Sequence, residues 1–279
     1  MKIYICCHKE KQLPVSDILQ PIHVGKAVSN INLNMIGDNT GDNISEKNKN
    51  YCEMTATYWI WKNVKEDVVG LCHYRRYFNF KNEHVSSEHI KINKLSPDFA
   101  EWSGNLKEIV APILKEYDVI LPTKIGIKKH HRTIYDFYKK EHVISDLDMV
   151  LDVIKEKYPN QYETAYQVLH TEIEGYYANM LVTKKEIFDA YAEWIFGILF
   201  EVEKRIQKEV ETRDTHQQRV YGFLAERLMT VYIALHPELK IKEVPIVFIE
   251  DNKKAWRKYV FRSWKRKILE KLGLRKDYK

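Results

Sequence analysis

The chain has 279 residues and a mass of 33.3 kDa, enough to bury a hydrophobic core in one large domain or two small ones. Hydrophobic residues make up 44% of the sequence and charged residues 30%, a balance that excludes a disordered chain. With 10 Gly, 8 Pro and no repeat of fixed period, collagen-like and solenoid architectures are excluded too. No apolar stretch approaches the roughly 20 residues that span a bilayer, so we expect no transmembrane helix.

Positive charge is concentrated at the C-terminus. Residues 253–279 contain twelve Lys and Arg against only Glu270 and Asp277, a net charge of +10 in a chain whose total is +6. Residues 1–252 therefore carry a net charge of −4. The basic tail and the mildly acidic body are expected to meet different partners.

The basic tail has an amphipathic pattern. Its apolar residues recur every four positions, at Trp256, Val260, Trp264, Ile268 and Leu272. A basic helix with such a face is typical of helices that lie on an anionic membrane surface. Packing of this face on the protein core is the alternative, and nucleic acid is disfavoured because an acidic body repels it. We therefore predict an anionic membrane, and no nucleic acid, as the partner of residues 253–279.

The four cysteines, Cys6, Cys7, Cys52 and Cys72, form no C-x-x-C pair and lie in or beside apolar stretches. This pattern is typical of reduced, buried thiols that bind no metal. Together with the tail, it predicts a cytoplasmic protein that is peripheral to the inner face of the plasma membrane.

The N-terminal part begins with an apolar run over residues 2–7, which predicts a buried strand. A polar segment of loop character follows, with its clearest turn signal at residues 37–43. Asn50 is expected to cap a helix over residues 51–63, whose apolar residues have helical spacing.

The rest of the body changes from strands to helices. We predict strands at residues 67–72, 117–122, 176–183 and 244–250, and helices at residues 146–157, 161–170, 184–210 and 215–235. Strands that alternate with helices are typical of an α/β fold with a mostly parallel sheet. No clear linker divides this body into independent domains.

Two of the predicted strands end in basic segments. The first runs into His8 and Lys9, and the strand at 67–72 runs into His73, Arg75 and Arg76. Ligands of an open α/β sheet bind at the carboxyl ends of its strands, and paired guanidinium groups match a diphosphate. We therefore predict an anion site there. The alternative is that one arginine faces the ligand while the other pairs with a surface carboxylate.

Several common catalytic motifs are absent. There is no P-loop, no G-x-G-x-x-G turn, no G-x-S-x-G elbow and no H-E-x-x-H helix, which disfavours kinase, dinucleotide, serine-hydrolase and zincin functions. Asp146 and Asp148 form a D-x-D pattern, but acidic residues at the start of a helix also stabilise its dipole. The pattern alone does not indicate a metal site.

Longer blocks of the chain resemble a bacterial family found in capsule and O-antigen clusters, long labelled a domain of unknown function. The family includes galactofuranosyltransferase-like enzymes. The similar blocks are residues 38–48 with Gly41, Asp42 and Asn43, residues 50–63 with Glu53 and Tyr58, and residues 70–78 with His73, Tyr74, Arg75 and Arg76. Shorter blocks agree at residues 118–122, 142–148, 179–180, 194–196 and 219–228, so the similarity covers residues 2–250.

The resemblance implies a glycosyltransferase with a GT-A-like nucleotide-sugar-binding fold in residues 1–250. Residues 1–125 would be the donor-binding half and residues 126–250 a helix-rich acceptor half, followed by the amphipathic tail at 251–279. The reaction would move a hexose, galactofuranose or galactose, from a UDP-sugar to a lipid-linked glycan. Two rival functions are a sugar or polyol phosphotransferase and a non-catalytic membrane scaffold.

The resemblance also bears on the metal. In GT-A enzymes the strand that leads into the donor site usually ends in an acidic D-x-D that binds a divalent ion. Here the equivalent strand ends in His73, Tyr74, Arg75 and Arg76. Fixed cations can stabilise a leaving diphosphate in place of a metal, so we expect no metal cofactor.

Roles follow for the candidate residues. The predicted donor-binding residues are His8, Asp42, Asn43, Glu53, Tyr58, His73, Arg75 and Arg76. The predicted acceptor-binding residues are His142, Asp148, Asn179, Arg219 and Arg227. Asp146 and Glu226 are candidates for the base that deprotonates the acceptor hydroxyl. The alternatives are that Asp146 caps a helix and that Glu226 pairs with Arg219 or Arg227.

Overall fold

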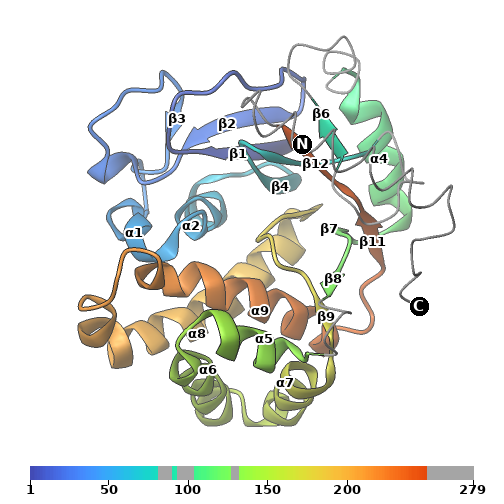
Figure 1. Ribbon diagram of the computed structural model, residues 1–279. Helices are drawn as coiled ribbons and strands as arrows, with labels where there is room; N and C mark the ends of the chain where they lie inside the picture. The colour runs from blue at the N-terminus through green and yellow to red at the C-terminus, as the bar shows by residue number, and fades with distance from the viewer. Residues whose placement is uncertain (81–89, 93–103, 127–131, 250–279) are drawn as a thin grey trace, which may run out of the picture.

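Helices cover both faces of a central sheet in the computed structural model, which describes residues 1–80, 90–92, 104–126 and 132–249 (Figure 1). Within these ranges, no helix combines the length and apolar character needed to cross a membrane. The predicted amphipathic helix of the tail lies outside the described residues.

The strands form one large and one small sheet. They are β1 (Lys2–Cys7), β2 (Leu19–His23), β3 (Ile36–Gly37), β4 (Val68–His73), β5 (Arg76–Phe78), β6 (Ile90–Ile92), β7 (Val119–Pro122), β8 (Ile125–Gly126), β9 (Glu174–Gly175), β10 (Leu181–Lys184), β11 (Ile241–Val244) and β12 (Ile246–Ile249). In the described chain, the main path of the large sheet runs β11-β7-β10-β4-β1-β2-β3. β5 leaves this path from β4 and pairs with β12, which also pairs with β6, while β8 and β9 pair separately.

The helical segments lie on the two sides of this sheet. They are η1 (Lys26–Val28), η2 (Ser45–Lys47), α1 (Asn48–Tyr51), α2 (Met54–Asn63), α4 (Leu106–Glu116), α5 (Ile134–Glu141), α6 (Ile144–Lys157), α7 (Pro159–Thr171), α8 (Lys185–Val210), η4 (Gln217–Arg219) and α9 (Val220–Leu235). Figure 1 shows α5–α9 gathered together on one side of the sheet.

Alternating side chains of the sheet build two hydrophobic cores. In β1, Tyr4 and Cys6 pack in the core shared with α2 and α5–α9, whereas Ile3 and Ile5 pack in the core shared with α4. This alternation follows from the two-residue period of a strand. Both faces of β1 are thus covered, as its continuous apolar sequence predicts.

The sheet is mixed, whereas we predicted it to be mostly parallel. β1 pairs in parallel with β2 and β4, but β10 runs antiparallel to both β4 and β7. The reason is the direction of entry: β10 starts opposite Leu71, near the carboxyl end of β4, after the chain has passed through α5–α7. This reversal places the residues just before β10 beside the end of β4.

Several predicted elements need correction. The segment predicted as loop contains β2 and β3, hidden by Pro21 and Gln20 within β2. The helix predicted over residues 51–63 is broken between α1 and α2, and Asn50 does not cap it but donates a hydrogen bond to the Gln218 carbonyl oxygen (2.7 Å). Helices α4 and α5 were not among the predicted elements, and the strand predicted at 176–183 is confined to its last part, in β10.

Asp38 joins the segments that follow β2 and β3. Its fully buried carboxylate accepts hydrogen bonds from the backbone N–H groups of Gly25 (2.8 Å) and Lys26 (3.1 Å) and from the hydroxyls of Ser45 and Thr55 (2.6 Å). One side chain therefore connects η1, η2 and α2. Buried donors of this kind are costly when they lose their acceptor.

Replacing Asp38 by Ala is expected to lower the free energy of unfolding by about 3 kcal/mol, because three buried donors and one partly buried donor lose a charged acceptor. Urea denaturation followed by circular dichroism measures this. The exposed Asp17→Ala variant is the control and should change stability by no more than about 0.5 kcal/mol. Equal stabilities of the two variants would show that the Asp38 cluster is not an important constraint.

Candidate functional site

The carboxyl ends of β1 and β4 meet at one edge of the sheet. The two strands pair in parallel with Cys6 opposite His73, and the Tyr74 backbone N–H donates to the Cys6 carbonyl oxygen (3.2 Å). The His8 ring consequently lies edge-on to the Tyr74 ring, with 5.1 Å between their centroids. The two basic segments that the sequence places after separate strands are thus brought together.

A cavity of about 710 Å³ opens at this edge. It is lined by residues from β1, β4, the α1–α2 break, the 211–219 loop and α9: Cys6, His8, Lys9, Val24, Asn48, Lys49, Cys52, Glu53, His73, Tyr74, Arg75, Arg76, Thr215, Arg219, Gly222, Phe223 and Glu226. Clefts of this size suit a small-molecule substrate.

Cationic side chains dominate the lining. The cavity walls carry Lys9, Lys49, Arg75, Arg76 and Arg219. Within the described chain, none of them forms an ion pair with a carboxylate, although the described part contains many other ion pairs. These five cations outnumber the two carboxylates of the lining, Glu53 and Glu226, and a net positive charge in a concave site attracts anions. The predicted anion site is therefore supported by geometry as well as by sequence.

Arg219 is fixed on two sides by neutral groups. Its Nε donates to the Cys52 Sγ (3.2 Å), and its guanidinium lies over the Phe223 ring, 5.3 Å from the centroid. The His142 ring also stacks on Phe223, with 4.1 Å between their centroids. The two terminal amino groups of Arg219 have no hydrogen-bond partner in the described chain, so they remain as a donor fork for an anion.

Cys52 has a strained backbone. Its φ of 52° and ψ of −131° interrupt the helix between α1 and α2, a conformation that few residues other than glycine adopt. The Asn48 side-chain amide donates to the Cys52 carbonyl oxygen (2.7 Å) and to the Thr55 hydroxyl (3.1 Å), which in turn donates to Asp38. The break turns the Cys52 thiol toward Arg219 and places Glu53 in the cavity wall.

Two carboxylates line the cavity, and each is held by a neighbour. Glu53 accepts a hydrogen bond from the Asn179 side-chain amide (2.7 Å), which also donates to the Gly222 carbonyl oxygen (3.1 Å). Glu226 accepts from Arg227 (2.7 Å). Burial raises the pKa of the Glu226 carboxyl above its ordinary value, and the Arg227 charge opposes this shift.

Arg227 lies behind the cavity in an aromatic enclosure. Its guanidinium is 5.1 Å from the ring centroids of Tyr138 and Tyr177 and 5.7 Å from that of Phe137. Only 3% of its side chain is exposed, so it does not reach a ligand in the cavity. The structure therefore places Arg227 as the partner of Glu226, which was one of the alternatives from the sequence, instead of in contact with an acceptor.

His73 lies between the cationic and acidic parts of the cavity. Its Nε2 is 2.8 Å from the Ala178 carbonyl oxygen and 3.9 Å from the Glu53 carboxylate. Burial lowers the pKa of His73, and a carbonyl oxygen only accepts, so the neutral ring carries its proton on Nε2. Burial also lowers the pKa of His8, with Lys9 and Arg75 adding to the shift. Both histidines act here as neutral groups.

Several predicted site residues do not line the cavity. Asp42 accepts a hydrogen bond from the Tyr58 hydroxyl (3.0 Å), and Asn43 bonds to the Gly41 carbonyl oxygen, so these three form a local cluster. Asp148 accepts from the Tyr135 hydroxyl (2.8 Å). Their donor and acceptor roles receive no support from the geometry, because their polar groups are occupied outside the cavity.

Asp146 is also placed elsewhere. Its carboxylate is buried in a two-pronged ion pair with Arg213, at 2.6 and 2.8 Å, and it does not cap its helix. The structure therefore leaves Glu226 as the candidate base. His142 and Asn179 lie directly behind cavity residues: His142 against Phe223 and Asn179 against Glu53. Burial near Arg227 lowers the pKa of His142 to about 4, so its ring is neutral as well.

Sequence reasoning missed several cavity residues: Asn48, Lys49, Cys52, Thr215 and Phe223. Lys49 and Cys52 lie within the family-like block at residues 50–63 or next to it, but their spacing gave no signal of a shared wall. Thr215 and Phe223 come from a segment predicted to be one helix.

The described His, Cys, Asp and Glu side chains are dispersed. In the part of the chain that the structure describes, no three His, Cys, Asp or Glu side chains are grouped to hold an ion. Arg213 and Tyr135 occupy the carboxylates of the D-x-D pattern, and lysines and arginines surround the end of β4. A hard cation prefers a cluster of oxygen ligands, and the carboxylates in the described lining of the cavity are Glu53 and Glu226.

The profile of a family described as a domain of unknown function (DUF4422) matches residues 2–237. The chain belongs to this family. The apo structure of the bifunctional glycosyltransferase WbbM is similar to it, with a TM-score of 0.82 and 34% sequence identity over 90% of this chain. The match covers 45% of the WbbM chain, so this chain spans less than half of that protein. No curated protein matches it.

These similarities confirm two predictions from the sequence. The chain has the α/β, GT-A-like fold of a glycosyltransferase, with its helices concentrated in the C-terminal half. The match to a domain of unknown function over residues 2–237 agrees with the resemblance of the N-terminal blocks, whereas their likeness to galactofuranosyltransferases stays a prediction.

If Arg75 and Arg76 bind a diphosphate through paired donors, Arg75→Lys or Arg76→Lys should weaken the binding of inorganic pyrophosphate about tenfold, although the charge is kept. Isothermal titration calorimetry gives the dissociation constants. Lys204→Gln removes an exposed cation far along α8 and serves as the control. Wild-type affinity in both lysine variants would mean that neither arginine makes the paired contact.

Proposed function

We propose that this protein is a glycosyltransferase that uses a UDP-sugar donor and a glycan acceptor. The observation that carries the proposal is the unpaired cationic wall at the carboxyl ends of β1 and β4, which faces a partly buried carboxylate across one cavity. The similarity of fold and sequence to a bifunctional glycosyltransferase supports the same reaction class.

The two sides of the cavity would perform the two halves of the reaction. The cations bind the diphosphate and stabilise the negative charge that it gains when its bond to the sugar breaks. Glu226 accepts the proton of the acceptor hydroxyl as that oxygen forms the new bond to the sugar. The products are UDP, the elongated glycan and a protonated Glu226 that returns its proton to solvent.

The identities proposed for the transferred sugar and for the acceptor rest on the family resemblance. It favours galactofuranose or galactose as the transferred hexose and a lipid-linked glycan of capsule or O-antigen synthesis as the acceptor. The cationic wall favours a metal-independent reaction, because Arg and Lys supply the charge that a metal supplies elsewhere. The basic tail favours a place on the inner membrane face, where such an acceptor is anchored.

The test is to incubate the protein with UDP-galactofuranose or UDP-galactose and a lipid-linked glycan, with and without EDTA. We expect UDP release and a heavier glycan in both conditions. A phosphotransferase would release UMP instead, and a scaffold would release neither nucleotide. Loss of activity in EDTA that Mn²⁺ or Mg²⁺ restores would contradict the metal-independent reaction.

The pH dependence tests Glu226 as the base. A base must be ionised, so activity falls as the pH drops through the pKa of Glu226, which burial has raised. Arg227→Gln removes the charge that opposes this shift, so the acidic limb of kcat/KM should move to higher pH. Arg227→Lys keeps a charge and should move it less. An unchanged acidic limb in both variants would exclude Glu226 as the group that titrates.

Deleting residues 253–279 tests membrane binding. We expect the shortened protein to bind UDP normally but to stop sedimenting with vesicles containing anionic lipid, because each Lys or Arg contributes about 1 kcal/mol at such a surface. Binding by the full chain should weaken as salt rises, with a remainder due to Trp256 and Trp264. If Trp256→Ser with Trp264→Ser unfolds the protein instead of releasing it from vesicles, the tail packs on the core.

A further inference from the structure

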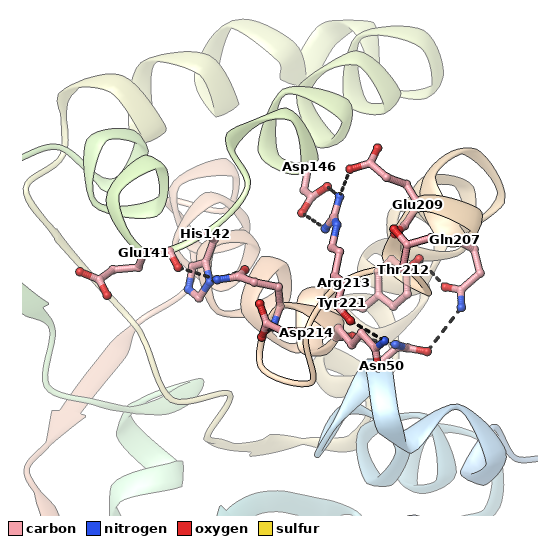
Figure 2. A network of polar contacts seen from close by, with 12 residues as sticks. Asn50, Glu141, His142, Asp146, Gln207, Glu209, Thr212, Arg213, Asp214 and Tyr221 are labelled. Carbon is pink, nitrogen blue, oxygen red and sulfur yellow. Dashed lines mark hydrogen bonds and ion pairs between the residues drawn. The ribbon is translucent and has the colours of Figure 1, made fainter.

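The loop at residues 211–219, between α8 and α9, faces the cavity on one side and a polar network on the other. Two of its residues, Thr215 and Arg219, line the cavity. Arg213 bonds to Asp146 of α6 (Figure 2), Gln217 bonds to the Glu141 carbonyl oxygen of α5, and Gln218 bonds within the loop. The position of Arg219 therefore depends on contacts made behind the cavity.

The strongest of these contacts is an ion pair between Arg213 and Asp146 of α6. Both terminal amino groups of Arg213 reach the carboxylate, at 2.6 and 2.8 Å, and only 8% of the arginine side chain and 2% of the aspartate side chain are exposed. Arg213 also bonds to Glu209 on α8 (2.7 Å), whose side chain is 64% exposed. Figure 2 shows the arginine between these two carboxylates.

Amide side chains complete the network. Gln218 donates to the carbonyl oxygens of Glu211 (3.1 Å) and Arg213 (2.8 Å), which closes the loop on itself. The Gln218 carbonyl oxygen accepts from Asn50 of α1 (2.7 Å), and Gln217 donates to the carbonyl oxygen of Glu141 (2.9 Å). The loop is thus attached to α1, α5 and α6, but only the α6 contact joins two buried charges.

We propose that Asp146 is a positioning residue: through Arg213 it holds the 211–219 loop so that the donor fork of Arg219 faces the diphosphate. This role rests on the proposed function. Without the Asp146 charge, Arg213 would be a buried cation whose remaining carboxylate partner, Glu209, is exposed. The arginine would then move outward to water and to Glu209, and the loop would lift away from α6.

Lifting the loop would weaken binding of the diphosphate, because the direction in which the Arg219 side chain points matters as well as its charge. Its Nε and its flat face are already used by Cys52 and Phe223, so its two terminal amino groups are aligned in one direction. Groups in a binding site must be held to within about 0.5 Å of the productive position. A displaced Arg219 keeps its charge but loses its paired contact with phosphate oxygens.

The chain supplies a matched control. Arg205 of α8 forms an ion pair with Glu156 of α6 (2.6 Å) and with Glu201, so it contacts the same helix, α6, as the Arg213 pair but from α8 instead of from the loop. This second pair is solvent-exposed, with 56% of the Glu156 side chain accessible, and does not touch the loop. Asp146→Asn and Glu156→Gln therefore remove equivalent charges with different expected consequences.

The experiment combines hydrogen–deuterium exchange of the full-length protein with calorimetric titration of UDP. In Asp146→Asn we expect faster exchange in the peptide covering residues 211–219 and about tenfold weaker UDP binding. Glu156→Gln should change neither. The double variant Asp146→Asn/Arg213→Gln removes the ion pair without burying an unpaired charge, so the loop, which has lost the same contact, should again exchange faster and UDP should bind more weakly.

The other possible results also decide whether Asp146 positions the loop. Unchanged exchange in the loop of folded Asp146→Asn would overturn the proposal, and so would faster exchange with wild-type UDP affinity. If Asp146→Asn does not fold, the double variant decides: a folded double variant with faster loop exchange and weaker UDP binding supports the positioning role, and one that keeps wild-type loop exchange, or does not fold, overturns it. If the wild-type protein binds neither UDP nor pyrophosphate, the proposed function fails, and the exchange data still show whether Asp146 holds the loop.

Discussion

The parallel pairing of β1 with β4 is the constraint on which the cavity depends. It sets Cys6 opposite His73, so that the residues following each strand leave the sheet at the same edge. Gly70 lets β10 approach β4 closely, because a Cβ there would lie 2.8 Å from the Leu181 carbonyl oxygen. With β10 running in the opposite direction, Ala178 and Asn179 arrive at this edge and hold His73 and Glu53. Three strands thus define the floor of one site.

Buried charges of the helical layer are paired, whereas the cations of the cavity wall have no carboxylate partner in the described chain. In the helical layer each buried charge has a partner, as in the Arg213–Asp146 and Arg227–Glu226 pairs. Such pairs contribute little net stability but cost much when one partner is lost, so they specify position more than they stabilise the fold. In the cavity wall, by contrast, Lys and Arg have no carboxylate partner in the described chain. The buried ion pairs therefore hold in place the elements from which cavity cations such as Arg219 extend.

The sequence predicts this site in part. Local patterns were sufficient for β1, β4 and their basic ends, because an apolar run followed by His, Lys or Arg is visible without knowledge of the fold. They were not sufficient for Asp146, whose partner Arg213 lies 67 residues away, or for Asp42 and Tyr58, which bond to each other. Thr215 was missed because a predicted helix does not show where it starts, and here the chain first forms the 211–219 loop; Phe223 lies within the helix as predicted, but its spacing does not show which face of α9 meets the cavity.

The direction of β10 shows a further limit of local patterns. Its apolar residues predict a strand, but parallel and antiparallel partners demand the same residues, and only the preceding helices decide from which edge the chain enters. The left-handed conformation of Asn179, with φ of 45°, forms part of this entry. The residue was selected from the sequence as an acceptor contact, yet its amide is used to hold Glu53.

The unpaired cations also connect function to stability. Like charges around an empty cavity repel one another, so the ligand-free protein retains an unfavourable electrostatic energy that a bound anion removes. A diphosphate that binds only the folded state stabilises it by RT ln(1 + [L]/Kd), about 2.7 kcal/mol at one hundred times Kd. The buried pairs behind the cavity oppose this repulsion, because they hold α9 and the 211–219 loop in place whether or not a ligand is bound.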